Sequence, residues 1–218
     1  MNPELIRNIV EQGTKEIDPN NSYITAIEGP VCAGKSSLIE HLSNMGIGVI
    51  LEYSEYVAHA NQDFPKFPPK DSNTAKKSFE FFLKLEKRRY RDLASLSQPQ
   101  ISIDRSIYTL LAFETGARAI TGIDIFDWGI NRLQAEPGLI VPDHIYYLDV
   151  SSDESKRRAK ENNISIPEFL LSNRFNNGFK NFFITLSRIY PQYVTIVSAE
   201  RPIRDIALSF QTSILLSK

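Results

Sequence analysis

Short apolar segments alternate with longer amphipathic segments along most of this chain. Five of the short segments have the length and the content of β-branched or aromatic residues that are typical of buried strands. They cover residues 23–28, 47–51, 100–104, 144–150 and 193–197. Helix-forming stretches separate them, and this alternation indicates a parallel sheet covered by helices on both faces. The pattern therefore predicts an α/β fold with a five-stranded parallel sheet.

The longest amphipathic segment lies between the second and third predicted strands. Residues 61–70 are broken by prolines, and residues 73–95 then repeat apolar side chains at spacings of three and four, which predicts one long helix. Phe79 and Phe82 lie on its apolar stripe. Such a stripe usually packs in a core, but the aromatic faces near the start of the helix are also suited to a pocket for a ring.

Composition narrows the class of protein. The 218 residues suit one domain, and the formal net charge of −1 argues against a broad surface for nucleic acid. We find no hydrophobic signal segment and no apolar run of membrane-spanning length. The single cysteine, Cys32, excludes an intramolecular disulfide. We therefore expect a soluble cytoplasmic protein of one domain, with a short amphipathic helix at about 3–12 and with neither nucleic acid nor membrane as a partner.

The first strand runs directly into a glycine-rich loop that precedes a helical pattern. Its sequence, GPVCAGKS, matches the phosphate-binding pattern G-x-x-x-x-G-K-[ST]. Glycines let the backbone curl around phosphates, and the helix N-terminus favours negative charge. In such a loop Lys35 reaches the β- and γ-phosphates, and the Ser36 hydroxyl lies on Mg²⁺. The residues that we expect to bind the nucleotide are Gly29, Pro30, Val31, Cys32, Ala33, Gly34, Lys35, Ser36 and Ser37.

Polar residues follow the predicted strands, where an open parallel sheet binds its ligands. Glu52 follows the second strand and is placed to accept a proton from a hydroxyl, although a solvated acidic turn is an alternative. Asp104 ends the third strand, as a partner of the metal or as a cap of the turn. Arg105 is suited to contact phosphate oxygens or to pair with a carboxylate such as Glu52 or Glu55, and both are compatible.

Three phrases together resemble the thymidylate kinase and deoxynucleoside kinase group of P-loop kinases. They are GPVCAGKSS, DRSIY at 104–108 and PDHIYYLDVSSDESKRR at 142–158. The resemblance extends from about residue 23 almost to the C-terminus. It implies a three-layer P-loop NTPase fold, an acceptor-side insertion at about 53–95 and a lid at about 156–175. The long helix resembles the element through which this group dimerises, so a homodimer is one option.

The resemblance also implies roles for particular residues, with ATP as phosphate donor and Mg²⁺ as cofactor. The catalytic set is Lys35, Glu52, Asp104, Arg105 and Arg158, of which Arg158 matches the lid arginine and also binds ATP. The metal set is Ser36 and Asp104, with Asp104 acting directly or through water. The acceptor-binding set is Glu52, Phe79, Phe82, Arg88, Arg105 and Tyr108.

The two branches of the group differ at the strand ends. Thymidylate kinases carry a DR[YFH]-like motif after the third strand, and their acceptor is already a phosphate. Deoxynucleoside kinases carry Glu-Arg-Ser there and a Glu-Pro pair after the second strand, whose carboxylate acts as a base toward the sugar 5′-hydroxyl. This chain has Asp104-Arg105-Ser106, and its Glu52 is followed by Tyr53. The motifs place a hydroxyl acceptor slightly ahead of a nucleoside monophosphate.

The resulting hypothesis is ATP-dependent phosphoryl transfer to a small acceptor, most readily a nucleoside or a nucleotide. A non-nucleoside acceptor such as an aminoglycoside is an alternative, because residues 53–71 depart from both branches. A regulatory nucleotide-binding module with little turnover is a second class. The missing guanine-reading NKxD motif argues against a GTPase switch.

Overall fold

The computed structural model describes residues 6–7, 9, 22–59 and 63–216. The helix predicted at about 3–12 lies largely outside the described residues. Within the described part, no helix has both the length and the apolar character needed to cross a membrane.

The described strands form one parallel sheet in the order β2-β3-β1-β4-β5. The strands are β1 (Tyr23–Glu28), β2 (Gly48–Ile50), β3 (Gln100–Asp104), β4 (His144–Asp149) and β5 (Val194–Ser198). The five predicted strands are thereby confirmed. β2 is shorter than the apolar run 47–51 that predicted it, because it lies at the sheet edge and pairs with β3 alone over three residues.

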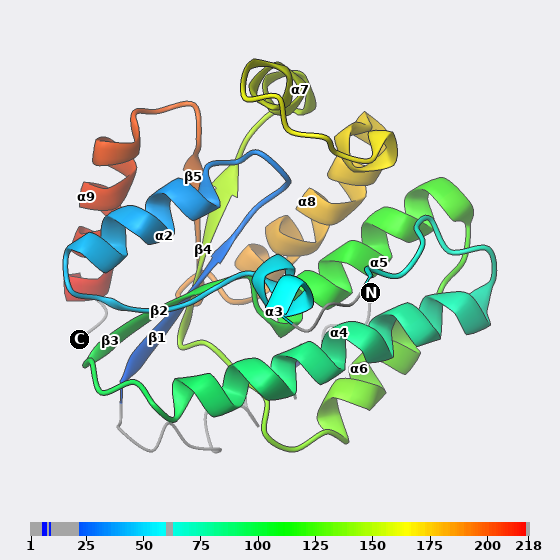
Figure 1. The fold of residues 1–218 in the computed structure, drawn as a ribbon, viewed down its shortest axis with the longest axis horizontal. Coiled ribbons are helices and arrows are strands. Elements are labelled where there is room, and N and C mark those ends of the chain that lie inside the picture. The colour runs from blue at the N-terminus through cyan, green and yellow to red at the C-terminus, as the bar shows by residue number, and fades with distance from the viewer. Residues whose placement is uncertain (1–5, 8, 10–21, 60–62, 217–218) are drawn as a thin grey trace.

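Helices cover both faces of the sheet (Figure 1), which confirms the three-layer architecture of the P-loop NTPase fold. On one face lie α2 (Lys35–Asn44) and α9 (Ile203–Leu216). The other face carries α4 (Ser72–Leu93), α5 (Ile107–Thr121), α6 (Phe126–Gln134) and α8 (Asn173–Ile189). The shorter elements α3 (Tyr53–His59), α7 (Ser152–Glu161) and the 3₁₀ turn Glu168–Leu171 follow strands or precede α8.

The core has two halves, one on each side of the sheet. In β4 the side chains of Ile145 and Tyr147 pack toward α5 and α8, and those of Tyr146 and Leu148 pack toward α2 and α9. All four are at most 1 % exposed. A strand that is buried on both faces has no need of polar positions, and this is why the strands appear in the sequence as continuous apolar runs.

The parallel register brings the functional segments to one edge of the sheet. Ile27 near the end of β1 pairs with Asp104 at the end of β3, and β2 pairs with β3 on its other side. The phosphate loop, Glu52 and Arg105 therefore emerge next to one another, although Glu52 and Arg105 are 53 residues apart.

Candidate active site

The loop after β1 has the curled backbone that its sequence predicts. Gly29 and Gly34 adopt positive φ angles of 147° and 91°, and Cys32 has a φ of 58°. A Cβ atom on Gly29 would lie 2.7 Å from the carbonyl oxygen of Leu148, so only glycine fits there. The first turn of α2 carries no acidic residue. The loop and the helix N-terminus therefore leave a place where backbone N–H groups can meet an anion.

Lys35 begins α2 and folds back over the loop. Its Nζ donates to the carbonyl oxygen of Pro30 at 3.0 Å, and the side chain is buried. Burial lowers the pKa of Lys35, as does the charge of Arg105, while nearby carboxylates oppose this shift. A buried ammonium held over the loop is suited to move from a carbonyl onto a phosphate oxygen.

Ser36 and Asp104 bring two hard oxygen groups together next to the loop. The Ser36 Oγ donates to Oδ2 of Asp104 at 3.4 Å. The Asp104 carboxyl is buried, and its Oδ1 atom has no hydrogen-bond partner among the described residues. Burial raises the pKa of Asp104. An unpartnered oxygen beside a serine hydroxyl suits Mg²⁺, which takes one or two protein oxygens and completes its shell with phosphate and water.

Arg105 and Glu52 form an ion pair at the end of β3 and β2. Arg105 Nε donates to the Glu52 carboxylate, and its Nη1 donates to the carbonyl oxygen of Gly29 at 3.2 Å. Burial favours a higher pKa for Glu52, but the charges of Arg105 and then Lys35 outweigh it and hold this pKa at about 2. The predicted pairing of Arg105 with a nearby carboxylate is thus present. Glu52 is ionised at any physiological pH.

A fully buried arginine supports this corner from α4. Arg89 donates through Nη2 to the carbonyl oxygens of Asp104 and Arg105, both at 2.8 Å, and through Nη1 to Glu86 at 2.8 Å. Its guanidinium lies 4.8 Å from the centre of the Tyr53 ring, and the Tyr53 hydroxyl donates to Glu86. Because Arg105 has a φ of 68°, these contacts stabilise an uncommon backbone at the site.

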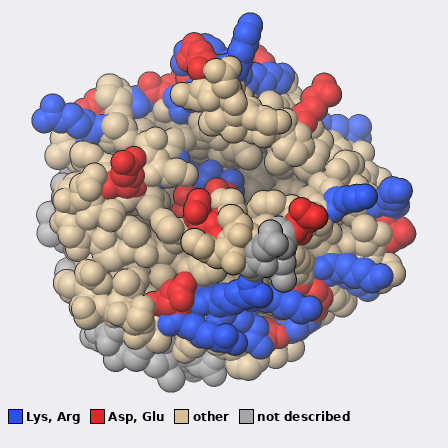
Figure 2. All heavy atoms as spheres, in the orientation of Figure 1, with Lys and Arg blue, Asp and Glu red and all other residues tan. Residues whose placement is uncertain are grey.

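The structure does not bring Arg88 to the cavity beside the loop, where its predicted role in acceptor binding would place it. Arg88 is half-buried and does not line the cavity next to the loop, whereas its neighbour Arg89 points into the protein. The sequence does contain a pattern that indicates the inward position of Arg89. Phe82, Glu86 and Arg89 follow one another at spacings of four and three, which places them on one face of the helix. The pattern is easily missed because Arg89 follows two other basic residues, Lys87 and Arg88, and such a run usually indicates an exposed basic surface. Figure 2 shows Lys and Arg gathered on the surface over α4.

Glu28 is a buried acid that the sequence analysis overlooked. It ends β1 immediately before the loop and accepts hydrogen bonds from the Ser106 backbone N–H at 2.9 Å, from the Ser106 hydroxyl at 2.7 Å and from the Thr109 hydroxyl. Burial raises its pKa to about 7, although these hydrogen bonds act in the opposite direction. Glu28 joins β1 to the start of α5 and so fixes the loop relative to Arg105. A glutamate that ends an apolar strand was the available signal.

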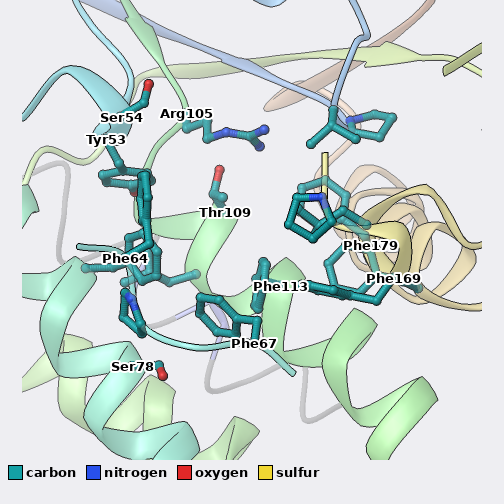
Figure 3. A pocket seen from close by; sticks show the side chains of 18 of the residues that line it. Tyr53, Ser54, Phe64, Phe67, Ser78, Arg105, Thr109, Phe113, Phe169 and Phe179 are labelled. Carbon is teal, nitrogen blue, oxygen red and sulfur yellow. The ribbon is translucent and has the colours of Figure 1, made fainter. Parts of the chain in front are cut away.

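A cavity of about 430 Å³ opens beside the loop and the Glu52–Arg105 pair. The face in Figure 2 is hollowed near its centre, with acidic and basic side chains at the hollow. Figure 3 shows Arg105 at one end of the cavity, Thr109 and Phe113 along the wall formed by α5, and Phe67 next to Phe113. The aromatic lining consists of Tyr53, Phe64, Phe67, Phe79, Phe82, Phe113, Phe169, Phe175 and Phe179. Phe79 and Phe82 therefore line the cavity where the sequence analysis places an acceptor.

Tyr108, the other residue predicted at the acceptor, is likewise not brought to this cavity. The side chain is fully buried, its ring centre is 6.0 Å from that of Tyr193, and it does not line the cavity. Thr109, Leu110 and Phe113 are the α5 residues that line it. Tyr108 lies about 100° around the helix from Thr109 and packs in the core.

Arg158 on α7 contacts the phosphate loop. Its Nη1 donates to the carbonyl oxygen of Cys32 at 3.3 Å, and its Nη2 donates to that of Ala199 at 2.8 Å. Glu154 accepts from Nε of Arg158 at 2.7 Å. The neighbouring Arg157 is exposed and pairs with acidic residues of its own helix. The structure thus brings Arg158, and not Arg157, to the loop.

A strand, a phosphate-binding loop and a helix at the edge of a parallel sheet define a P-loop nucleotide-binding fold.

No protein-family model matches the sequence, and no curated protein matches it either. Solved structures do match. Deoxyadenosine kinase from M. mycoides with the products dCMP and dCDP superposes with a TM-score of 0.65 at 19 % identity, over 88 % of this chain and 98 % of that one.

The same kinase with bound dATP gives a TM-score of 0.63 at 20 % identity, over 88 % of this chain and 98 % of that one. With bound dCTP it gives a TM-score of 0.63 at 20 % identity, over 89 % of this chain and 100 % of that one. At this identity the likeness shows the fold. The chain therefore has the fold of a deoxynucleoside kinase of the P-loop group, as the resemblance in sequence predicts.

Proposed function

We propose that this protein transfers the γ-phosphate of ATP to a hydroxyl group of a small acceptor, and that the acceptor is a nucleoside. The observation that carries this proposal is the position of the Glu52–Arg105 pair. It lies between the phosphate loop and the aromatic cavity, and both of its members line that cavity. The pair would therefore lie next to a donor nucleotide bound at the phosphate loop and also next to an acceptor bound in the aromatic cavity.

On the donor side, positioning and charge neutralisation account for most of phosphoryl transfer. The loop N–H groups and Lys35 would hold the β- and γ-phosphates, and Arg158 would close the site from α7. Ser36 and Asp104 would hold Mg²⁺, which neutralises the charge on the transferred group. Arg105 would turn part of its planar guanidinium toward the oxygens between donor and acceptor.

On the acceptor side, Glu52 would orient the hydroxyl and accept its proton. A carboxylate with a pKa of about 2 is a weak base, but it is fully ionised and already placed. In a loose transition state the attacking oxygen gains little positive charge early, so a weak base in the right position is adequate. The pair with Arg105 would hold the carboxylate ready before the acceptor arrives.

The charge of the cavity favours a hydroxyl acceptor over a phosphate acceptor. Arg105 is the one cationic side chain among the described residues that line the cavity, and Glu52 and Glu114 also line it. Glu52 already balances the charge of Arg105, and burial raises the pKa of Glu114 to about 8, so these lining residues leave no cation over for the roughly two negative charges of a monophosphate. The aromatic walls suit a flat ring instead. The M. mycoides enzyme of similar fold is a deoxyadenosine kinase, which supports a nucleoside.

The test is a coupled assay of ADP release across nucleosides, their 5′-monophosphates and aminated sugars. We expect ADP release that depends on a nucleoside and that is much slower with the matching monophosphate. Faster turnover of monophosphates would indicate a kinase of the thymidylate type. Slow hydrolysis that no acceptor stimulates would indicate a regulatory module instead.

A further inference from the structure

Helix α5 presents one face to the cavity. Thr109, Leu110, Phe113 and Glu114 all line it, and the spacings of three and four residues between the first two and the last two place them on one side of the helix. Three of these side chains are common in a pocket for a ring, but a glutamate among phenylalanines is not. Glu114 is only 7 % exposed. Its place in the wall calls for a specific partner.

Among the residues that the structure describes, Glu114 has no hydrogen-bond or ion-pair partner. Each of the other buried polar side chains in the wall has one, namely Tyr53 with Glu86, Ser78 with the carbonyl of Thr74, Arg105 with Glu52 and Thr109 with Glu28. No hydrogen bond or ion pair joins the Glu114 side chain to another residue in the described part of the chain. Arg118, one turn further along α5, binds Asp124 at 2.7 Å.

The protonation state of Glu114 determines what it can recognise. Burial raises its pKa to about 8, and the charge of Asp124 acts in the same direction. At pH 7 the side chain is therefore mainly a neutral carboxyl, with one O–H donor and one C=O acceptor next to each other. A neutral carboxyl complements a flat ring edge that offers one acceptor and one donor.

The distance from the reaction centre suits a nucleoside. Helix α5 begins at Ile107, directly after Arg105 and Ser106, and Glu114 lies seven residues further, or about 10 Å along the helix axis. Phe82 and Phe113 contribute aromatic walls to the same cavity. A nucleoside with its hydroxyl at Glu52 would therefore extend its base along α5 toward Glu114.

We propose that Glu114 is a specificity-determining residue that pairs with a base carrying an amino group beside an unprotonated ring nitrogen, as adenine and cytosine do. The carboxyl O–H would donate to the ring nitrogen, and the carboxyl C=O would accept from the amino group. A basic ring nitrogen suits an acidic O–H better than the carbonyl oxygen of thymine does. This inference rests on the proposed nucleoside acceptor.

The test measures binding without turnover. Titration calorimetry would compare deoxyadenosine and deoxycytidine with their analogues that lack the exocyclic amine, and with thymidine. We expect Glu114→Leu to weaken binding of the two amino nucleosides about ten- to a hundredfold, roughly the loss of two hydrogen bonds. The amine-free analogues keep the ring nitrogen and lose only one hydrogen bond, so we expect the same variant to weaken their binding only about three- to tenfold. Glu114→Gln keeps a donor and an acceptor, and we expect it to bind within a few-fold of the wild type.

The variants also separate this inference from a structural role. Because Glu114→Leu removes an unpaired buried acid, it should fold at least as stably as the wild type. Equal weakening of amino and amine-free nucleosides, a wild-type preference for thymidine, or no binding of any nucleoside would each overturn the inference. Amine-dependent binding through Glu114 without any ADP release would leave the inference standing and overturn the proposed kinase function instead.

Discussion

Replacing Glu52 with glutamine separates its two roles, as a base and as the partner of Arg105. If Glu52 accepts the proton of a hydroxyl, kcat should fall by roughly 10²- to 10⁴-fold, the usual contribution of a general base. Glutamine keeps a carbonyl oxygen that can accept from Arg105 Nε but loses the charge. The Glu52 side chain is 31 % exposed and that of Arg105 is 10 % exposed, so only part of the pairing free energy is at stake.

The expected stability cost of Glu52→Gln is therefore small. A hydrogen bond to a charged group contributes about 1.5–3 kcal/mol, and the variant would lose a fraction of this. A stability of roughly 5–15 kcal/mol leaves the variant folded. A large loss of kcat with a nearly unchanged melting temperature would thus report on chemistry rather than on folding.

The assay is steady-state ADP release with a saturating nucleoside, together with thermal unfolding of each variant. The matched control is Glu55→Gln, which makes the same change three residues further on, at an exposed position of α3. We expect the control to keep kcat within about twofold of the wild type, since most surface substitutions are nearly neutral. Near-normal kcat in Glu52→Gln would refute the assignment of Glu52 as the base.

Three further predictions concern buried groups. Arg89→Met should destabilise the fold by about 3–5 kcal/mol in urea unfolding, because it leaves the buried Glu86 without its cation, and a loss under 1 kcal/mol would contradict this. Gly29→Ala should abolish ATP binding in calorimetry, since its Cβ would lie 2.7 Å from a carbonyl oxygen of β4, and wild-type affinity would contradict this. In the wild type, the free energy of unfolding should fall as the pH rises from 7 to 8, and Glu114→Gln should reduce this fall. There the folded Glu114, with a pKa of about 8, still holds most of a proton that the unfolded chain has lost, so stability falls by about 1 kcal/mol between pH 7 and 8. Burial raises the pKa of Glu28 only to about 7, so Glu28 changes the stability mostly below pH 7. An unchanged dependence of stability on pH in Glu114→Gln would contradict the raised pKa of Glu114.

Much of the fold follows from local sequence patterns, because the three central strands β1, β3 and β4 are buried on both faces and the glycines of the phosphate loop have a backbone requirement. Gly29 and Lys35 could be assigned from spacing alone. Residues whose role depends on helix phase were harder to assign. Tyr108 and Arg88 are each one position away from a residue that faces the site, and a shift of one residue turns a side chain by about 100°.

The missed residues depend on contacts between distant segments. Glu28 binds Ser106 and Thr109 across 78 and 81 residues, and Arg89 holds carbonyls 15 and 16 residues away. Such contacts exist only once the sheet has formed. The predicted lid at about 156–175, the homodimer and the cytoplasmic location stay predictions from the sequence.

The most direct test of the central claim is to identify the product. The protein would be incubated with Mg²⁺, with ATP carrying ¹⁸O in its γ-phosphate, and with a nucleoside or its 5′-monophosphate, and the products would be analysed by mass spectrometry. We predict a labelled nucleoside 5′-monophosphate from the nucleoside, with little diphosphate from the monophosphate. Label appearing only in inorganic phosphate, or mainly in a diphosphate, would contradict a kinase that acts on a hydroxyl group.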